Sequence, residues 1–185
     1  AGDALTTGGF NVAMGYAALG TEDTGSRNVA IGHSALTSLN YDGAGYNIAI
    51  GYDCMELSGD SGGAANSNNT FVGGQSGQDI DEGCSDNVGM GRSALGNIGS
   101  GGTSCSQNTA LGTSAGSNLN GPGNNNTFVG YDAEPTGSSV SNEFTLGNSS
   151  VAVLRCQQTT ITALSDERDK TSIEDLPYGL DLSLI

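Results

Sequence analysis

The sequence predicts an all-β fold in which a short repeat builds a parallel β-roll, a form of solenoid. The first observation is a pattern of Asn, a β-branched residue, a small residue or Phe, an aliphatic residue and Gly, which recurs over residues 1–147. The second is the alternation of side chains within each copy, which is typical of a strand. The third is the stretch between copies, where Gly, Asn, Ser and Asp predominate as turns require. Together they predict one solenoid coil per copy.

Seven copies fit the pattern well, and an eighth fits it weakly because Glu143 stands in place of the Asn. The asparagines that open the copies are Asn11, Asn28, Asn47, Asn69, Asn87, Asn108 and Asn126. The glycines that close them are Gly15, Gly32, Gly51, Gly73, Gly91, Gly112 and Gly130, followed by Gly147 in the weak copy. Successive closing glycines are 17 to 22 residues apart, so each coil has room for two short strands and two turns. About eight coils stacked ~4.8 Å apart predict a rod roughly 38 Å long.

The alternation within each copy separates two faces. We expect aliphatic side chains such as Val12 and Met14 to fill the coil interior. The opposite face carries small residues, which would allow neighbouring chains to approach closely: Ala13, Ala30, Ala49, Gly89 and Ala110. Phe71 and Phe128 interrupt this small-residue face and are expected to fill gaps between chains. The second strand of each coil is expected at the apolar patch after the closing glycine, as at Ala17–Leu19.

The recurrent Asn supports two interpretations. Seven stacked asparagines could hydrogen-bond to one another as an amide ladder along the solenoid. Alternatively, the Asn side chains could simply satisfy turn backbone. The pattern alone does not favour one over the other.

Composition excludes several classes of function. The chain of 185 residues has a formal net charge of −15 and only five Lys and Arg, which argues against nucleic acid or an anionic membrane as a partner. No apolar run approaches the ~20 residues of a membrane span, so no membrane insertion is expected. Low apolar content with high charge is typical of disorder, but 31 glycines within a regular repeat favour an ordered solenoid. No pattern indicates a metal site or a cofactor.

The repeats resemble the head repeats of trimeric YadA-like adhesins, whose motif is Asn, any residue, Ala, Ile, Gly with a following Ser-Ala. Residues 28–32 and 34–35 match that motif closely, and the resemblance covers residues 8–147. It implies a left-handed parallel β-roll with three chains around one axis, so the expected assembly is a homotrimer. The coils here are longer and less regular than those of the adhesins.

The C-terminal residues follow a different pattern. Residues 148–156 and 159–164 have the composition of two strands, and we expect them to form a short β neck over 148–164. The next residues, Ser165 to Lys170 and then Ile173, resemble the opening of the self-cleaving intramolecular chaperone domain of phage endosialidases and tail fibres. The resemblance implies cleavage between Leu164 and Ser165, with Ser165 as the nucleophile and Lys170 as its base. Residues 165–185 would then be the beginning of that domain.

Three further residue types attract attention. Cys84 and Cys105 each lie seven residues before a closing glycine, so stacking predicts an intrachain disulfide between consecutive coils. Cys54 stands where other copies have Ala, and a buried thiol is expected there. His33, the single histidine, occupies a variable position that we expect to face outward. Acidic clusters such as residues 22–23 and 79–82 lack the ligand spacing of a Ca²⁺ loop and favour a solvated surface.

The sequence thus predicts a β-roll shaft over 1–147, a neck over 148–164 and a chaperone fragment over 165–185. The leading hypothesis is a rigid trimeric shaft of a viral tail fibre or spike, located in the virion and involved in host attachment. Its expected partners are two further copies, other virion tail proteins and a host receptor or glycan. Enzymatic activity is expected only as serine–lysine autoproteolysis in the complete chaperone. The alternatives are a cell-surface trimeric adhesin head and a glycan-degrading tailspike, which would need a groove with paired carboxylates.

Overall fold

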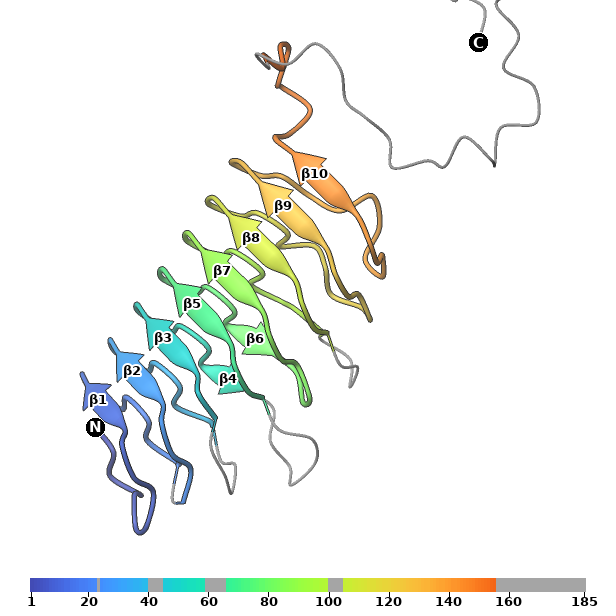
Figure 1. Cartoon of the computed structure of the whole chain (residues 1–185). Coiled ribbons are helices and arrows are strands. Elements are labelled where there is room, and N and C mark those ends of the chain that lie inside the picture. The colour runs from blue at the N-terminus through green and yellow to red at the C-terminus, as the bar shows by residue number, and fades with distance from the viewer. Residues whose placement is uncertain (23, 40–44, 59–65, 100–104, 156–185) are drawn as a thin grey trace, which may run out of the picture. The chain divides into compact units, whose positions relative to one another are not determined.

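The computed structural model describes residues 1–155 except residues 23, 40–44, 59–65 and 100–104. The chain divides into two compact units, Ala1–Ala152 and Val153–Ile185. The first unit is a solenoid of short strands joined by turns (Figure 1). Of the second unit only residues 153–155 are described, and they are exposed and have no regular structure.

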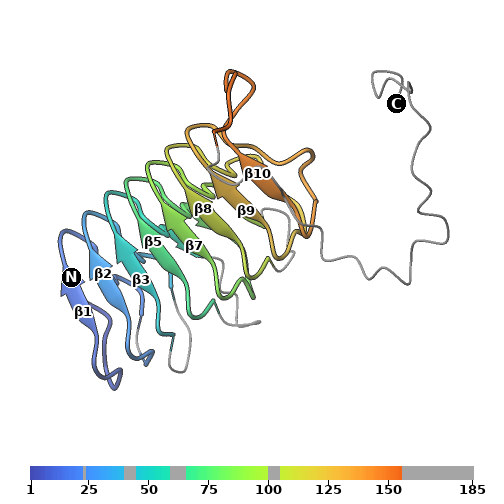
Figure 2. The ribbon, with the colours of Figure 1, turned by 45° about the horizontal axis from the view of Figure 1, so that its top comes forward.

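The main sheet of the first unit has eight parallel strands, one from each copy of the repeat. The strands are β1 (Val12–Met14), β2 (Val29–Ile31), β3 (Ile48–Ile50), β5 (Thr70–Val72), β7 (Val88–Met90), β8 (Thr109–Leu111), β9 (Thr127–Val129) and β10 (Phe144–Leu146). They stack in chain order with equivalent residues paired, as in Ala49 opposite Phe71. Figure 2 shows them side by side in one continuous sheet. The predicted parallel solenoid is confirmed, and its left hand stays a prediction.

A second strand forms in only two of the described coils. The strands β4 (Leu57–Ser58) and β6 (Asp79–Ile80) pair in parallel as a small separate sheet. Both begin after the apolar patch that follows the closing glycine, and the patch itself folds as turns, as at residues 16–19 and 52–56. The prediction of a second strand at Ala17–Leu19 is therefore wrong. The reason is local, because Ala17 and Leu19 adopt the left-handed conformation with φ of 56° and 51°, whereas a strand requires strongly negative φ.

The stacked asparagines form the amide ladder and also satisfy turn backbone, so both interpretations hold at once. The Oδ1 atom of Asn87 accepts hydrogen bonds from the backbone N–H and from the side-chain amide of Asn108, both at 3.0 Å. The Nδ2 atom of Asn87 donates to Asn69 Oδ1 at 3.0 Å and to the Cys105 carbonyl at 2.9 Å. The same side-chain link joins each pair of successive asparagines from Asn28 to Asn126. This network allows a row of polar side chains to be buried.

The two faces of the strands are inverted relative to the prediction. The small residues at the centre of the strands are buried inside the coils: Ala30, Ala49, Gly89 and Ala110, with Ala13 partly buried at the first coil. The aliphatic residues on either side of them face outward, and Val12 and Met14 are 47% and 63% exposed. The physical reason is that a coil built from three-residue strands encloses little space, and the ladder asparagines already occupy part of it.

Phe71 and Phe128 also lie inside the coils, and not between chains as predicted. Both side chains are fully buried. Each ring occupies space that a glycine leaves open: a Cβ on Gly89 would lie 2.5 Å from the Phe71 ring, and one on Gly116 would lie 2.6 Å from the Phe128 ring. A large side chain in one coil therefore fills the space that a glycine leaves open in the neighbouring coil.

Residues 148–155 are the part of the expected β neck that the structure describes, and the neck over 148–164 stays a prediction. Residues 148–155 contain no strand. Instead Asn148 forms a turn, in which its side-chain Oδ1 accepts from the Ser150 N–H and its carbonyl from the Val151 N–H, both at 3.0 Å. Residues 159–164 lie outside the described residues.

Candidate functional site

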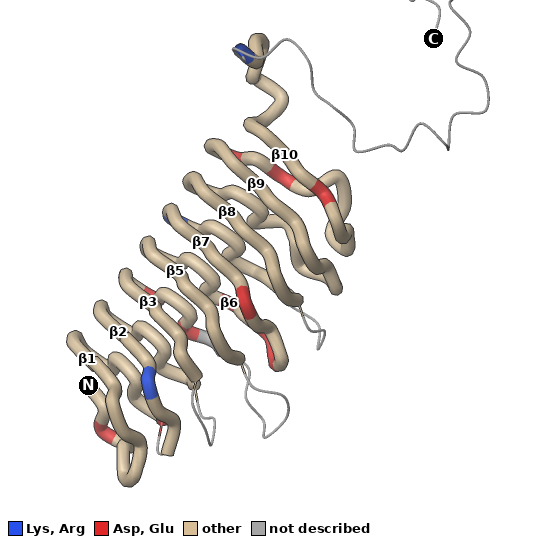
Figure 3. Tube along the Cα trace, viewed as in Figure 1, with Lys and Arg blue, Asp and Glu red and all other residues tan. Residues whose placement is uncertain are grey.

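The most extensive functional feature is the outward surface of the main sheet, which we call the outer sheet face. It consists of the first and third residue of each strand: Val12, Met14, Val29, Ile31, Ile48, Ile50, Thr70, Val72, Val88, Met90, Thr109, Leu111, Thr127, Val129, Phe144 and Leu146. None of these side chains is buried, and Met14 and Phe144 are 63% and 67% exposed. No strand of this sheet carries a charged residue, as the uncoloured strands in Figure 3 show. The face is largely apolar, with threonine at three of its sixteen positions. A surface of this kind is typical of interaction sites.

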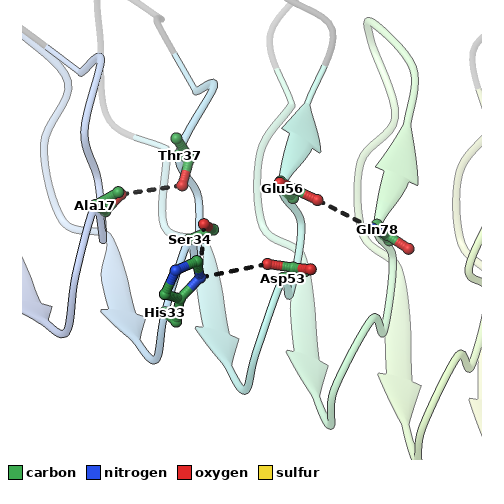
Figure 4. A network of polar contacts seen from close by, with 7 residues as sticks. All are labelled: Ala17, His33, Ser34, Thr37, Asp53, Glu56 and Gln78. Atoms are coloured by element: carbon green, nitrogen blue, oxygen red, sulfur yellow. Dashed lines mark hydrogen bonds and ion pairs between the residues drawn. The ribbon is translucent and has the colours of Figure 1, made fainter.

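A polar cluster follows the ends of β2 and β3. The Nδ1 atom of His33 lies 2.9 Å from the Ser34 hydroxyl and 3.6 Å from Asp53 Oδ1 (Figure 4). A Ser-His-Asp triad requires the hydroxyl and the carboxylate to contact different ring nitrogens. Here both groups contact the same nitrogen, so the cluster lacks the geometry of a hydrolase.

Two tyrosines sandwich the ring of His33. The ring centroids of Tyr16 and Tyr52 lie 5.2 Å and 5.3 Å from that of His33, in a stacked arrangement. Hydrogen bonding to Asp53 and the negative charge of that residue raise the pKa of the Tyr52 hydroxyl. As the sequence predicts, His33 faces outward, with 49% of its side chain exposed. The stack of Tyr16, His33 and Tyr52 therefore joins three successive coils along one side of the strands.

Side-chain hydrogen bonds add further links between coils in the same region. The Thr37 hydroxyl donates to the Ala17 carbonyl at 3.0 Å, and Gln78 Nε2 donates to Glu56 Oε2 at 2.9 Å (Figure 4). Each pair joins residues of different coils. These contacts indicate a structural role for this side of the solenoid.

Cys84 and Cys105 lie in neighbouring coils as predicted, but no disulfide joins them, and both are reduced thiols. The Cys105 N–H donates to Cys84 Sγ at 3.1 Å. A hydrogen bond between the two thiols raises the pKa of Cys84, with burial adding to the effect, and the same bond lowers the pKa of Cys105. The Cys105 thiol also contacts the next coil, because it donates to the Gly121 carbonyl and accepts from the Gly123 N–H.

The prediction for Cys54 is confirmed. Its thiol is fully buried, donates to the Phe71 carbonyl at 3.4 Å and forms no disulfide. Burial raises the pKa of this thiol to about 12. Cys54 is therefore a protonated core residue at neutral pH, without the thiolate character that chemistry requires.

One pocket of about 350 Å³ lies near β10 and contains two carboxylates, Asp132 and Glu134. Both oxygens of Glu134 are already hydrogen-bonded, to the Ser117 hydroxyl at 2.5 Å and the Asn118 N–H at 3.0 Å. Glu134 thus holds two coils together, and Asp132 is the carboxylate of the pocket that faces solvent. The pocket does not provide the pair of available carboxylates that a glycan-degrading site needs.

Glu22 is a residue whose environment sequence reasoning missed. It was expected in a solvated acidic cluster, but its side chain is fully buried. Its Oε1 atom accepts a hydrogen bond from the Gly25 N–H at 2.6 Å. Glu22 lies seven residues after its closing glycine, where Leu39 and Ile80 are buried in other coils. The burial of Glu22 could have been predicted from the sequence, because the equivalent position in other coils is apolar.

The residues of the expected self-cleavage site, Leu164, Ser165 and Lys170, lie outside the described residues. Within the described part, no group of three or more His, Cys, Asp or Glu side chains could hold a metal ion. No helix among those residues is long and apolar enough to span a membrane.

No family model, curated protein or solved structure matches the chain.

Proposed function

We propose that this chain is the shaft of a homotrimeric fibre, in which three outer sheet faces pack together around a common axis. The observation that supports the proposal best is the outer sheet face itself. Its apolar columns run along the whole stack of strands, so a partner of the same length and repeat would cover them most completely. A second and a third copy of this chain meet that requirement. Three copies close into a ring of faces and leave no apolar surface exposed.

The setting that we propose is a viral tail fibre or spike, with the shaft as a rigid structural element that serves host attachment. The resemblance of Ser165–Lys170 to the self-cleaving chaperone motif supports this setting. The coil interior also favours a structural role, because most of its polar side chains form the ladder and contacts between coils, and among the described residues only the Nδ2 atoms of Asn28 and Asn66 are buried without a partner. The site geometry offers no hydrolytic triad at His33 and no available carboxylate pair near β10.

The trimer is tested with Met90→Lys, which places an ammonium group at the centre of the outer sheet face. In a monomer this change is harmless, because Met90 is 47% exposed. In the trimer it buries three charges, at a cost of several kcal/mol. We therefore expect sedimentation velocity to show a trimer for the wild type and a monomer for Met90→Lys.

The matched control is Asn97→Lys, which adds the same charge at an exposed position outside the strands. This variant should remain trimeric. A wild type that sediments as a stable monomer, or a Met90→Lys variant as trimeric as the wild type, would contradict the proposal.

Maturation by self-cleavage is tested separately in a full-length protein with the complete chaperone domain. Ser165→Ala should abolish release of the C-terminal piece, because the nucleophile is lost. Trimer assembly should persist, because we propose that the three chains assemble before the chaperone cleaves itself off. Mass spectrometry of both proteins measures the outcome, and identical cleavage in the two would remove Ser165 from the mechanism.

A further inference from the structure

Two columns of exposed or partly buried residues border the outer sheet face. The upstream column consists of the residue just before each ladder position: Phe10, Arg27, Tyr46, Asn68, Asp86, Gln107, Asn125 and Asn142. The downstream column consists of the residue just after each closing glycine: Tyr16, His33, Tyr52, Gly74, Arg92, Thr113, Tyr131 and Asn148. Each strand of the main sheet therefore has one member of each column at its two ends.

The columns contain three residues with a full charge, Arg27, Asp86 and Arg92, and only Asp86 and Arg92 are opposed across one strand. Asp86 is the single carboxylate of the upstream column, and Arg92 is the single arginine of the downstream column. Both flank β7, and both side chains are exposed. Within the described residues the guanidinium of Arg92 forms no ion pair with its own chain, and the Asp86 carboxylate accepts only a 3.3 Å hydrogen bond from the adjacent Ser85.

Asp86 and Arg92 cannot meet within one chain. Five residues that include β7 lie between them, and six steps of extended backbone span roughly 20 Å. In a threefold trimer the two residues can meet between chains. The three equivalent strands at one level are then arranged head to tail around the axis. The upstream end of one strand then adjoins the downstream end of the strand in the next chain, which is a heterologous contact that closes into a ring.

The register between chains decides which residues meet. Closed rotational symmetry has no translation along the axis, so equivalent coils lie at the same level. In this register Asp86 of one chain meets Arg92 of the next. A shift of one coil would place Asp86 opposite Gly74 or Thr113, and would leave both charges without a partner at a desolvated edge. Electrostatic complementarity therefore selects the unshifted register.

The aromatic residues agree with this register. In the first three coils the upstream column forms a sandwich, with Arg27 Cζ 5.3 Å from the Phe10 ring centroid and 5.5 Å from that of Tyr46. The downstream column of the same coils is the Tyr16–His33–Tyr52 stack. In the unshifted register these two stacks lie opposite each other, so Phe10 faces Tyr16 and Tyr46 faces Tyr52. Between these two aromatic pairs the guanidinium of Arg27 faces the ring of His33.

We propose that Asp86 and Arg92 form an interchain ion pair, repeated three times around the shaft at the level of β7, which fixes the register of the chains. The inference rests on the proposed trimer. An isolated exposed ion pair contributes little to the free energy of association, but one trimer contains three such pairs. We expect them to change the trimer dissociation constant by about tenfold.

The test is a charge-reversal cycle: Asp86→Arg, Arg92→Asp and the double variant. Arginine is tolerated at position 86, because Arg27 occupies the equivalent position with the same left-handed backbone, at φ of 63° against 59° for Asp86. Each single reversal places like charges opposite each other three times, so we expect the trimer dissociation constant to rise roughly tenfold or more. The double variant restores opposite charges and should return to within about threefold of the wild type.

Two charge-matched controls lie outside the columns, at exposed positions: Asp3→Arg and Arg155→Asp. Neither should change trimer dissociation measurably. The rise in the trimer dissociation constant that each single reversal causes should also be smaller in 1 M salt, where the Debye length falls to about 3 Å.

Sedimentation over a concentration series measures all of these dissociation constants. A trimeric wild type whose double variant shows the sum of both single penalties would overturn the ion pair alone, whereas a monomeric wild type would overturn the trimer and the pair together.

Discussion

At the residue scale, the closing glycine is the position that tolerates substitution least. Its φ is +124° to +146° in the seven good copies, a region that side chains rarely adopt. The glycines also stack directly on one another, so that a Cβ on Gly73 would lie 2.5 Å from the carbonyl oxygen of Gly91. Backbone conformation and close packing thus demand glycine independently at the same point.

Two adjacent glycines provide a matched test of this argument. Gly73→Ala requires an unfavourable φ of +140° and displaces the next coil, so we expect a loss of at least about 3 kcal/mol in the free energy of unfolding. Gly74→Ala should change stability by less than about 0.5 kcal/mol, because its Cβ would meet only the Tyr52 carbonyl at 3.7 Å. Chemical denaturation monitored by circular dichroism measures both, and equal losses would contradict the argument.

The residue scale also shows where sequence reasoning fails. The glycines and asparagines of the repeat could be predicted, because few other residues meet their backbone and hydrogen-bonding requirements. The left-handed conformations of Leu19 and Met55, at φ of 51° and 49°, could not. Methionine and leucine rarely adopt this conformation. Here contacts between coils impose it, such as the hydrogen bond from the Met55 N–H to the Ser76 carbonyl at 3.1 Å.

At the element scale, the period of two in each strand predicts alternation but not which face is buried. Valine and methionine carry more apolar area than alanine, so their face would ordinarily be assigned to the core. The assignment fails here because the ladder asparagines share the face of the small residues. A buried Asn row needs partners at every level, and the coil interior supplies them. The position of the ladder, and not hydrophobicity, therefore decides the orientation of each strand and creates the outer sheet face.

The compensation between Phe71 and Gly89 yields a prediction at this scale. Gly89→Ala alone would clash with the Phe71 ring and should cost about 1–3 kcal/mol. Phe71→Leu alone leaves space unfilled and should cost about the same. The double variant should be more stable than the sum of the two losses by about 1 kcal/mol, since each change relieves the other. Thermal unfolding measures the cycle.

The control for this cycle combines Gly89→Ala with Phe128→Leu. The Phe128 ring packs against Gly116 and not against Gly89, so these two losses should simply add. Additive losses for the Phe71 pair as well would show that the ring and the glycine do not share the same space.

At the scale of the whole solenoid, the molecule behaves as a one-dimensional stack. Every strand of the main sheet pairs only with the strands before and after it in the repeat. The ladder and the closing glycines follow the same rule. Stability is therefore expected to be a sum of coil and interface contributions. Under this rule a complete coil can be removed, provided that the flanking coils find equivalent partners.

Deletion of residues 33–51 tests this rule, because it removes 19 residues from just after Gly32 up to and including Gly51. The new neighbours are equivalent: Asn28 meets Asn69, and Gly32 meets Gly73. We expect the shortened chain to fold, to keep its oligomeric state and to lose about 4.8 Å of length by small-angle scattering. Deletion of residues 33–42 is the control, because it removes half a coil and leaves β3 without its preceding turns. That variant should lose amide protection in hydrogen exchange over the coils on both sides of the deletion. If the complete-coil deletion were equally unprotected, the coils would not be the independent units that the repeat implies.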